Sequence, residues 1–360
     1  MRRAFTLLFA VLLAVLSPAQ AADWAPIKHD GRDYVSFDSL AKFYGLKDLK
    51  RDGSSVVMSL GVRSLRGQAN SVEFFINNLK FNLSYPVIEH EGKLCVSRMD
   101  LVKIIEPVLR PSLIKNPTAA VDTIILDPGH GGHDNGAVSN FGYEKTFTLD
   151  VANRTRLLLL QAGFKVFMTR STDTFIPLDG RVQFANKFPS ALFVSIHFNS
   201  GGQGTGLETY TLVPRGVPSM MADGPRVSDL VECRGNARDA ENIALATAMH
   251  ASMIIRSKMY DRGIKRGRFV VIRDVAIPGV LIEGGFLSNN YDAKIIATPE
   301  YRQGMANSIL QAVQIYKRAV SAKGTQYTAA ANPSAPTDAG STPTATPAPG
   351  QTKPRLCLPP

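Results

Sequence analysis

The chain has 360 residues, a length that suits two ordinary domains better than one. Hydrophobic residues make up 44% and charged residues 20%, which provides for a packed core and excludes wholesale disorder. The formal charge of +11 favours a polyanionic neighbour, and it fits nucleic acid, an anionic membrane surface or an acidic wall polymer equally well.

The first residues have the three parts of a secretory signal peptide. Met1-Arg2-Arg3 is basic, an apolar stretch covers residues 4–16, and Ala19 and Ala21 form a small-x-small cleavage site. The apolar stretch is too short to span a bilayer as a helix, so we expect no transmembrane segment. We predict a signal peptide over residues 1–21 and a protein exported to the periplasm or the extracellular cell wall. Export weakens the case for nucleic acid as a partner.

Residues 22–116 contain an internal repeat. Val35–Phe43 matches Val96–Ile104, 61 residues later, and in each copy a strand end meets a serine (Ser36 or Ser97) that can cap a short helix. Strand-like runs lie between the copies, at residues 55–60, 71–76 and 79–83. The pattern predicts a small α+β domain made of hairpins and two short helices.

This region resembles the N-terminal domain of copper amine oxidases, which occurs in many secreted bacterial proteins. The resemblance depends on the repeat and on Tyr85-Pro86-Val87-Ile88 ahead of Gly92. The region has no cluster of histidine, cysteine or carboxylate residues. We therefore expect a binding, spacing or purely structural role for it.

Residues 121–320 alternate apolar runs with helical patterns, which predicts an α/β domain. Near-continuous apolar strands indicate a sheet covered on both faces. Expected strands are 123–126, 164–169, 191–198, 207–212, 269–273 and 279–283, and expected helices are 145–161, 178–188, 238–259 and 299–320.

Side chains that bind metals or transfer protons follow three of these strands. His130 lies in the loop after 123–126, His197 ends 191–198, and Glu283 ends 279–283. Ligands of open α/β sheets bind outside the carboxyl ends of the strands, so we expect the three residues to converge. Glycines beside each of them would allow a close approach of the backbone.

Glu144 stands at the start of the helix that follows the His130 loop. Alone, it fits a favourable charge at a helix N-terminus, and each histidine alone fits a structural role equally well. Together, His130, His197 and a carboxylate are the donor set of a catalytic zinc site that keeps one position for water.

Five segments carry a second resemblance: LDPGHGG (126–132), GYEK (142–145), TRSTD (169–173), VSIHFNS (194–200) and IEGGFLSN (282–289). They are similar to the zinc-dependent N-acetylmuramoyl-L-alanine amidases that cleave bacterial peptidoglycan, and the resemblance covers about residues 121–318. It implies a mixed, mostly parallel sheet flanked by helices, with Zn²⁺ bound by His130, Glu144 and His197. It also implies that Glu283 takes the proton from the attacking water and returns it to the leaving amine.

Other polar residues near these motifs have weaker assignments. Asn199 and Asp127 are candidates for orienting the histidines. Arg170, Asp173 and Arg181 fit loop-bracing ion pairs as well as substrate contacts. We expect His250 to be structural or exposed, and we do not assign His133 as a fourth ligand.

Residues 214–233 lengthen the chain relative to the simplest members of the amidase family. In some relatives an inserted helix here plugs the zinc site until an activator, such as a cell-division protein, removes it. Asp223, Asp229 or Glu232 would supply the plug. The segment is rich in proline and glycine and has no helical period, which favours a surface loop.

Cys95, Cys233 and Cys357 are an odd number without a CxxC pair, so we expect neither a disulfide framework nor a cysteine zinc site. Residues 323–360 have almost no large apolar side chains, which predicts a disordered tail.

Three rival functions remain to be compared with the amidase. A zinc peptidase acting on peptidoglycan stem peptides would use almost identical local chemistry. A non-enzymatic wall-binding protein with a degenerate fold would lack a ligand or the catalytic glutamate, and all four residues are present. A nucleic-acid binder would show a basic stripe interleaved with aromatic residues, and none appears in the sequence.

Overall fold

The computed structural model describes residues 26–118, 121–220 and 224–321. The predicted signal peptide, the predicted tail, Asp223 and Cys357 lie outside these ranges. Among the described helices, none is both long enough and apolar enough to cross a membrane.

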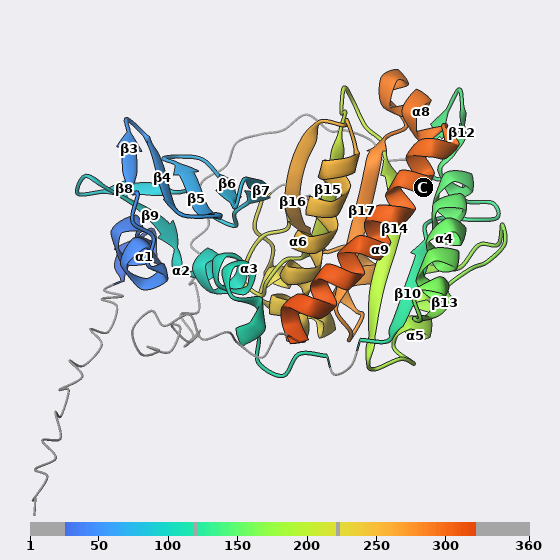
Figure 1. Ribbon diagram of the computed structural model, residues 1–360, viewed down its shortest axis with the longest axis horizontal. Helices are drawn as coiled ribbons and strands as arrows, with labels where there is room; N and C mark the ends of the chain where they lie inside the picture. The colour runs from blue at the N-terminus through green and yellow to red at the C-terminus, as the bar shows by residue number, and fades with distance from the viewer. Residues whose placement is uncertain (1–25, 119–120, 221–223, 322–360) are drawn as a thin grey trace, which may run out of the picture.

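The second part of the chain forms a mixed sheet between two layers of helices (Figure 1). Four neighbouring strands run parallel: β13 (Lys165–Met168), β10 (Thr123–Pro128), β14 (Ala191–Asn199) and β17 (Gly279–Phe286). The strand β15 (Leu207–Leu212) is antiparallel to β17, and β16 (Asp261–Gly267) is parallel to β15. The predicted α/β fold with a mostly parallel catalytic sheet is therefore confirmed.

Long helices cover one face of this sheet and short ones cover part of the other. The helices α4 (Glu144–Gln161), α6 (Asp239–Arg256) and α9 (Pro299–Ser321) pack on the face that carries Ile124 and Val194. On the opposite face, α5 (Leu178–Ala185) and α7 (Val270–Arg273) pack against Phe193 and Leu281. A further helix, α8 (Asn290–Ile296), follows β17.

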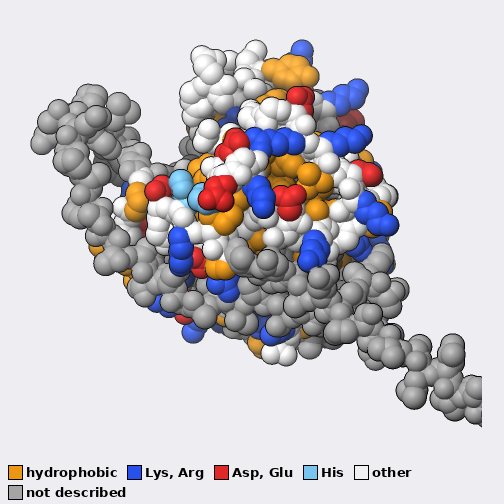
Figure 2. Space-filling model, turned by 90° about the vertical axis from the view of Figure 1, so that its left-hand side faces the viewer, with side chains coloured by type: hydrophobic (Ala, Val, Ile, Leu, Met, Phe, Trp, Pro, Cys, Tyr) orange, Lys and Arg blue, Asp and Glu red, His pale blue; other side chains and the backbone are white. Residues whose placement is uncertain are grey.

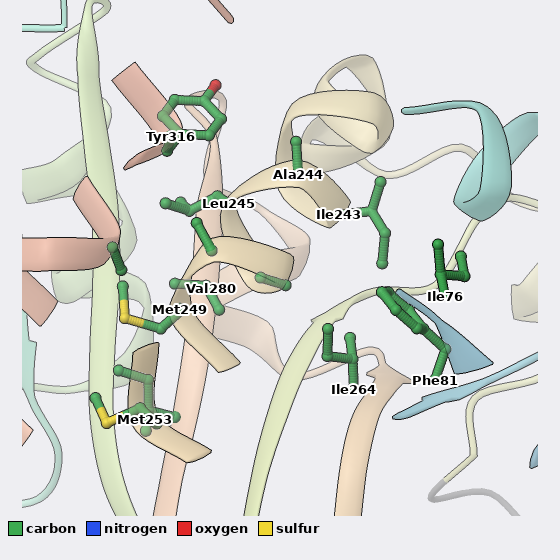
Figure 3. Packing of buried hydrophobic residues seen from close by; sticks show 14 of the residues in the cluster. Ile76, Phe81, Ile243, Ala244, Leu245, Met249, Met253, Ile264, Val280 and Tyr316 are labelled. Atoms are coloured by element: carbon green, nitrogen blue, oxygen red, sulfur yellow. The ribbon is translucent and has the colours of Figure 1, made fainter. Parts of the chain in front are cut away.

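The small N-terminal domain extends the same sheet. Its meander β3 (Lys50–Asp52), β4 (Ser55–Leu60), β5 (Arg63–Gln68), β6 (Glu73–Ile76) and β7 (Leu79–Asn82) joins β16 through the parallel pair Ile264↔Phe81, giving eleven strands. Figure 3 shows Ile76 and Phe81 beside Ile243 and Ile264, so the cores of the two parts are continuous.

A second, four-stranded sheet contains the internal repeat. Its strands lie in the order β1 (Ile27–His29), β2 (Arg32–Ser36), β9 (Lys93–Ser97) and β8 (Ile88–His90). The two copies pair antiparallel, with Val35 opposite Val96. Ser36 accepts a bond from the backbone N–H of Ser39 at 3.2 Å and caps α1 (Phe37–Tyr44). Ser97 caps α2 (Arg98–Asp100) in the same way, so both predicted caps are confirmed.

Polar contacts between the two parts involve the segment after α2, which continues as the π-helical turn η1 (Leu101–Ile105) and α3 (Glu106–Leu109). Lys103 forms an ion pair with Asp239 at 3.0 Å. The guanidinium of buried Arg266 donates to the carbonyl of Lys103 at 2.7 Å and to Ser84 Oγ at 3.2 Å. The parts therefore share a sheet, a core and buried polar contacts.

The expected strand at 269–273 is wrong. Residues Val270–Arg273 form the helix α7, and the strand of this region is β16, just before it. A run of four apolar residues has no period that separates a strand from a helix turn. The strand β16 was not predicted because it has a single hydrophobic residue, Ile264, among arginine, lysine and glycine residues. The strand β5 and the helix α8 were also not predicted.

Candidate metal centre

Glu144 is the centre of a cluster at the carboxyl ends of β10 and β14. His130 Nε2 lies 3.1 Å from Glu144 Oε1, and His197 Nδ1 lies 2.9 Å from the same oxygen. One ligand atom from each of the three residues lies within 4.8 Å of the others. The backbone N–H groups of Phe198 and Ala137 donate to the two carboxylate oxygens at 3.0 and 2.8 Å. The sequence placed these three residues in one site, and the structure brings them together.

Burial and hydrogen bonding set the charge of Glu144. Its side chain is 4% exposed, and burial alone would raise the carboxyl pKa. Hydrogen bonds with His130 and His197 outweigh burial and hold the pKa well below the usual value of 4.5. Glu144 is therefore an anion that faces two imidazoles, which is the charge state a metal ligand needs.

Glycines allow the three candidate ligands to lie close together. A Cβ on Gly129 would lie 2.2 Å from His197 Cε1. A Cβ on Gly136 would lie 2.5 Å from Glu144 Oε2 and 2.6 Å from His130 Cδ2. Neither position tolerates a side chain unless one of these three residues moves.

Gly136→Ala tests this close packing. Gly136 has φ +64°, so alanine brings backbone strain as well as the clash with Glu144 and His130. We expect about a 10- to 100-fold loss of metal affinity, the range typical of changes around a metal ligand. Isothermal titration with Zn²⁺ measures this. Gly61→Ala is the matched control, because Gly61 has φ +59° and an added Cβ there would meet nothing within 4 Å. Equal zinc affinity in both variants would contradict the assignment.

Glu283 lies beside the cluster, on β17. The sheet register pairs it with His197 on β14 and with Glu208 on β15. Its Oε2 is buried and has no hydrogen-bond partner among the described residues. Burial, followed by the charges of Glu144 and Glu208, raises its pKa well above 4.5. A buried carboxylate oxygen without a partner, next to a group of potential ligands, is suited to accept a proton from a bound molecule.

The residue that orients His130 was missed. Asp134 Oδ2 lies 2.8 Å from His130 Nδ1, which leaves Nε2 directed at Glu144. The only sequence signal was an aspartate in the same glycine-rich loop. The two residues proposed for this role are wrong: Asn199 donates to Glu208 at 2.7 Å, and Asp127 accepts from Thr169, Arg181 and Ser195.

Buried arginines brace the loop that carries His130. Arg170 donates to the carbonyls of Pro128 and Gly129 at 3.0 and 2.7 Å. Arg181 pairs with Asp127 at 2.8 Å and donates to the carbonyl of His130 at 2.7 Å. Of the two interpretations that the sequence left open for these residues, the structure supports bracing.

The neighbouring Asp173 has a similar role. It pairs with Lys145 at 2.9 Å and accepts from the N–H of Gly132 at 2.8 Å.

Two further histidines are separate from the cluster. His133 packs against Phe175, with the ring centroids 4.2 Å apart and the ring planes tilted by 41°. His250 is buried and lies 3.0 Å from Thr209 Oγ1 and 2.9 Å from Asp261 Oδ1, which confirms a structural role. Cys95 and Cys233 are free thiols, and burial raises the pKa of Cys95 to about 11.

Residues 214–233, the insert relative to the simplest family members, follow β15. Their described part lies at the end of the sheet opposite to the one that carries Glu283. Because β15 is antiparallel to β17, its last residues lie near the start of β17, away from Glu283. Asp229 is buried in an ion pair with Arg268 at 2.9 Å, and exposed Glu232 lines a surface pocket next to it. Neither acid plugs the metal cluster, and the interpretation of this segment as a surface loop is confirmed for the described residues.

Fold and cluster together define an α/β protein with a hydrolase-type His/Glu/His group and an adjacent carboxylate. The N-acetylmuramoyl-L-alanine amidase family matches residues 124–315, and the chain belongs to this family. A sporulation-specific N-acetylmuramoyl-L-alanine amidase of Bacillus subtilis is 33% identical over 200 residues, which cover 54% of this chain and 69% of the relative. AmiA of Escherichia coli is 32% identical over 217 residues, covering 54% of this chain and 75% of AmiA.

A solved structure is similar over the same part of the chain. It is the catalytic domain of the amidase CwlV from Bacillus (Paenibacillus) polymyxa, with 32% identity and a TM-score of 0.46. The match covers 55% of this chain and 99% of that domain.

Proposed function

We propose that the protein is a zinc-dependent hydrolase that cleaves the amide bond between N-acetylmuramic acid and L-alanine in peptidoglycan. The observation that carries the proposal is the cluster of His130, Glu144 and His197 beside Glu283, in a chain of the amidase family. Cell wall turnover or cell separation is the role that this activity would serve.

The donor set fits zinc. Two imidazole nitrogens and one anionic carboxylate match the His₂Glu ligands of catalytic zinc sites, which leave a position for water. When bound, zinc supplies a Lewis acid that activates water and polarises the scissile carbonyl. Asp134 fixes the ring of His130, and Arg170 and Arg181 hold the loop behind it.

Glu283 is the proton carrier in this proposal. Its free carboxylate oxygen accepts the proton of the attacking water. Its pKa, raised by burial, then favours delivery of that proton to the nitrogen of the leaving L-alanine.

Digestion of purified peptidoglycan tests the activity and the metal together. We expect intact stem peptides that begin with L-alanine, identified by mass. Chelator should abolish their release, and added Zn²⁺ should restore it. Undigested peptidoglycan at full zinc occupancy would contradict the proposal, as would activity unaffected by complete metal removal.

The same digest distinguishes the amidase from the alternative function, a zinc peptidase acting on stem peptides. A peptidase would release shortened stems and leave L-alanine attached to the glycan. The local chemistry of the two reactions is almost identical, so the bond that is cut must be identified from the products. Amidase relatives over more than half of this chain favour the amidase.

The proposed location is the periplasm or the extracellular wall, because the first 21 residues have the pattern of a signal peptide. Relief of a plug by a cell-division activator is not part of the proposal, since the described residues of the insert lie at the opposite edge of the sheet.

A further inference from the structure

We propose that the open sheet face of the small domain, continued by Arg262 and Lys265, is a binding strip for the acidic stem peptides of peptidoglycan. This inference rests on the proposed function, because it assigns the substrate polymer to a surface beyond the catalytic centre. The binding strip is defined by seven residues on neighbouring strands: Lys50, Val57, Arg66, Phe75, Lys80, Arg262 and Lys265.

The sheet register aligns the first five of these residues in one row. Lys50 lies opposite Val57, Val57 opposite Arg66, Arg66 opposite Phe75, and Phe75 opposite Lys80. Residues that face each other across antiparallel strands point to the same side of the sheet. The row therefore crosses all five strands of the meander on a single face.

This face is free of the domain's own core. The alternate residues of the same strands, including Met58, Leu65 and Phe74, are buried on the other side, where Phe37 of α1 packs. On the open face, Lys50, Val57 and Arg66 are exposed. The guanidinium of Arg66 lies 3.8 Å from the centre of the Phe75 ring. Figure 2 looks onto this end of the molecule, where basic and acidic side chains are interspersed with hydrophobic ones.

The row continues toward Glu283 without a break in the sheet. Lys80 lies beside Gly263 of β16, where an added Cβ would meet its Cγ at 2.8 Å. From β16, Arg262 reaches Glu208 Oε2 at 2.7 Å, and Lys265 pairs with the same oxygen. Glu208 in turn lies opposite Glu283 in the register. Five strand spacings separate β17 from β5, which is about 24 Å at about 4.8 Å each.

The charges along the binding strip indicate an acidic ligand. Five basic side chains share two carboxylates: Glu73 pairs with Lys80, and Glu208 pairs with Arg262 and Lys265. Arg66 and Lys50 have no ion-pair partner among the described residues. Peptidoglycan stems carry free carboxylates at repeated positions along the glycan, so one polymer can contact the active centre and the basic residues together. A single muropeptide can reach Arg262 and Lys265 beside Glu208 but is too short to reach Arg66, about 24 Å from β17.

The test compares the double variant Lys50→Glu/Arg66→Glu with Arg156→Glu, an exposed charge reversal on α4. Binding of the full mature chain to purified peptidoglycan is measured in a Glu283→Gln background, so that the polymer stays intact. We expect about a tenfold loss of binding for the double variant alone, and wild-type binding that weakens with salt. Lys50→Gln/Arg66→Gln should show an intermediate loss, and thermal unfolding checks that each variant is folded.

A second measurement separates this inference from the proposed function. With Glu283 intact, the ratio of turnover on polymer to turnover on a single muropeptide should fall about tenfold in the double variant and stay at the wild-type value in Arg156→Glu. An unchanged ratio and unchanged binding would overturn the binding strip while the amidase stands. Equal losses in Arg156→Glu, or binding to anionic lipid vesicles in place of peptidoglycan, would overturn it too. Failure of the wild type on both substrates would instead refute the proposed function.

Discussion

Glu283→Gln should lower the turnover of peptidoglycan about 10²- to 10⁴-fold, the range that general acid–base catalysis contributes. Glutamine has nearly the same size and cannot carry the proton. The change also affects a carboxylate whose Oε2 has no hydrogen-bond partner among the described residues, so no hydrogen bond to that oxygen is lost. Initial rates of stem-peptide release measure the effect.

The zinc content distinguishes a proton carrier from a ligand. Glu283 is outside the His130/Glu144/His197 group, so zinc per chain, measured by mass spectrometry of the metal, should stay at the wild-type value in Glu283→Gln. Glu283→Asp is the companion variant, because it keeps the carboxylate but shortens the side chain. Loss of zinc in Glu283→Gln, or turnover within threefold of wild type, would contradict the assigned role.

The strands that the sequence revealed are those whose burial is continuous. The strands β10, β14, β15 and β17 are buried along nearly their whole length, and their apolar runs predicted boundaries to within three residues. The strand β16 is different, because one of its faces carries Arg262 and Lys265 beside Glu208. A strand that carries charges on an uncovered face has little hydrophobic signal.

The sequence did not predict that the strands of the two parts form one continuous sheet. It depends on a single parallel pair, Ile264↔Phe81, between strands that are 183 residues apart in the chain. The repeat did predict the two helix caps of the small domain, since Ser36 and Ser97 cap their helices by the same hydrogen bond.

In the candidate site, the sequence predicted which residues come together, but it did not predict which side chains hydrogen-bond to the histidines and orient them. His130 follows β10, His197 and Glu283 lie near the carboxyl ends of β14 and β17, and Glu144 begins α4. The fold brings such positions together at one end of the sheet. The orientation of His130 depends instead on the path of its loop, which turns back so that Asp134 meets Nδ1. Asn199 and Asp127 lie close in sequence to the histidines, yet their side chains bond to Glu208 and to Arg181.

Glu144→Gln should remove most of the bound zinc and, with it, most of the activity. The amide keeps the volume, and its single oxygen can still accept from one of the two N–H groups, of Phe198 or Ala137, that bond to the carboxylate. It lacks the negative charge that His130 and His197 surround, and an uncharged amide is a weaker zinc ligand than a carboxylate. We expect at least about a 10²-fold loss of zinc affinity and a parallel loss of turnover, partly restored by excess Zn²⁺.

Glu241→Gln is the matched control for Glu144→Gln, because Glu241 is also a buried glutamate that accepts a backbone N–H, from Thr118 at 2.7 Å. It lies on α6, outside the His130/Glu144/His197 group, and accepts from Tyr316 at 2.9 Å. Losing its charge should lower the midpoint of urea unfolding without changing the zinc content. For Glu144→Gln we expect the opposite result. Most of its zinc should be lost, while the urea midpoint of its metal-free form should change little. If both variants lost zinc equally, the loss would come from the fold, and Glu144 would not be a ligand.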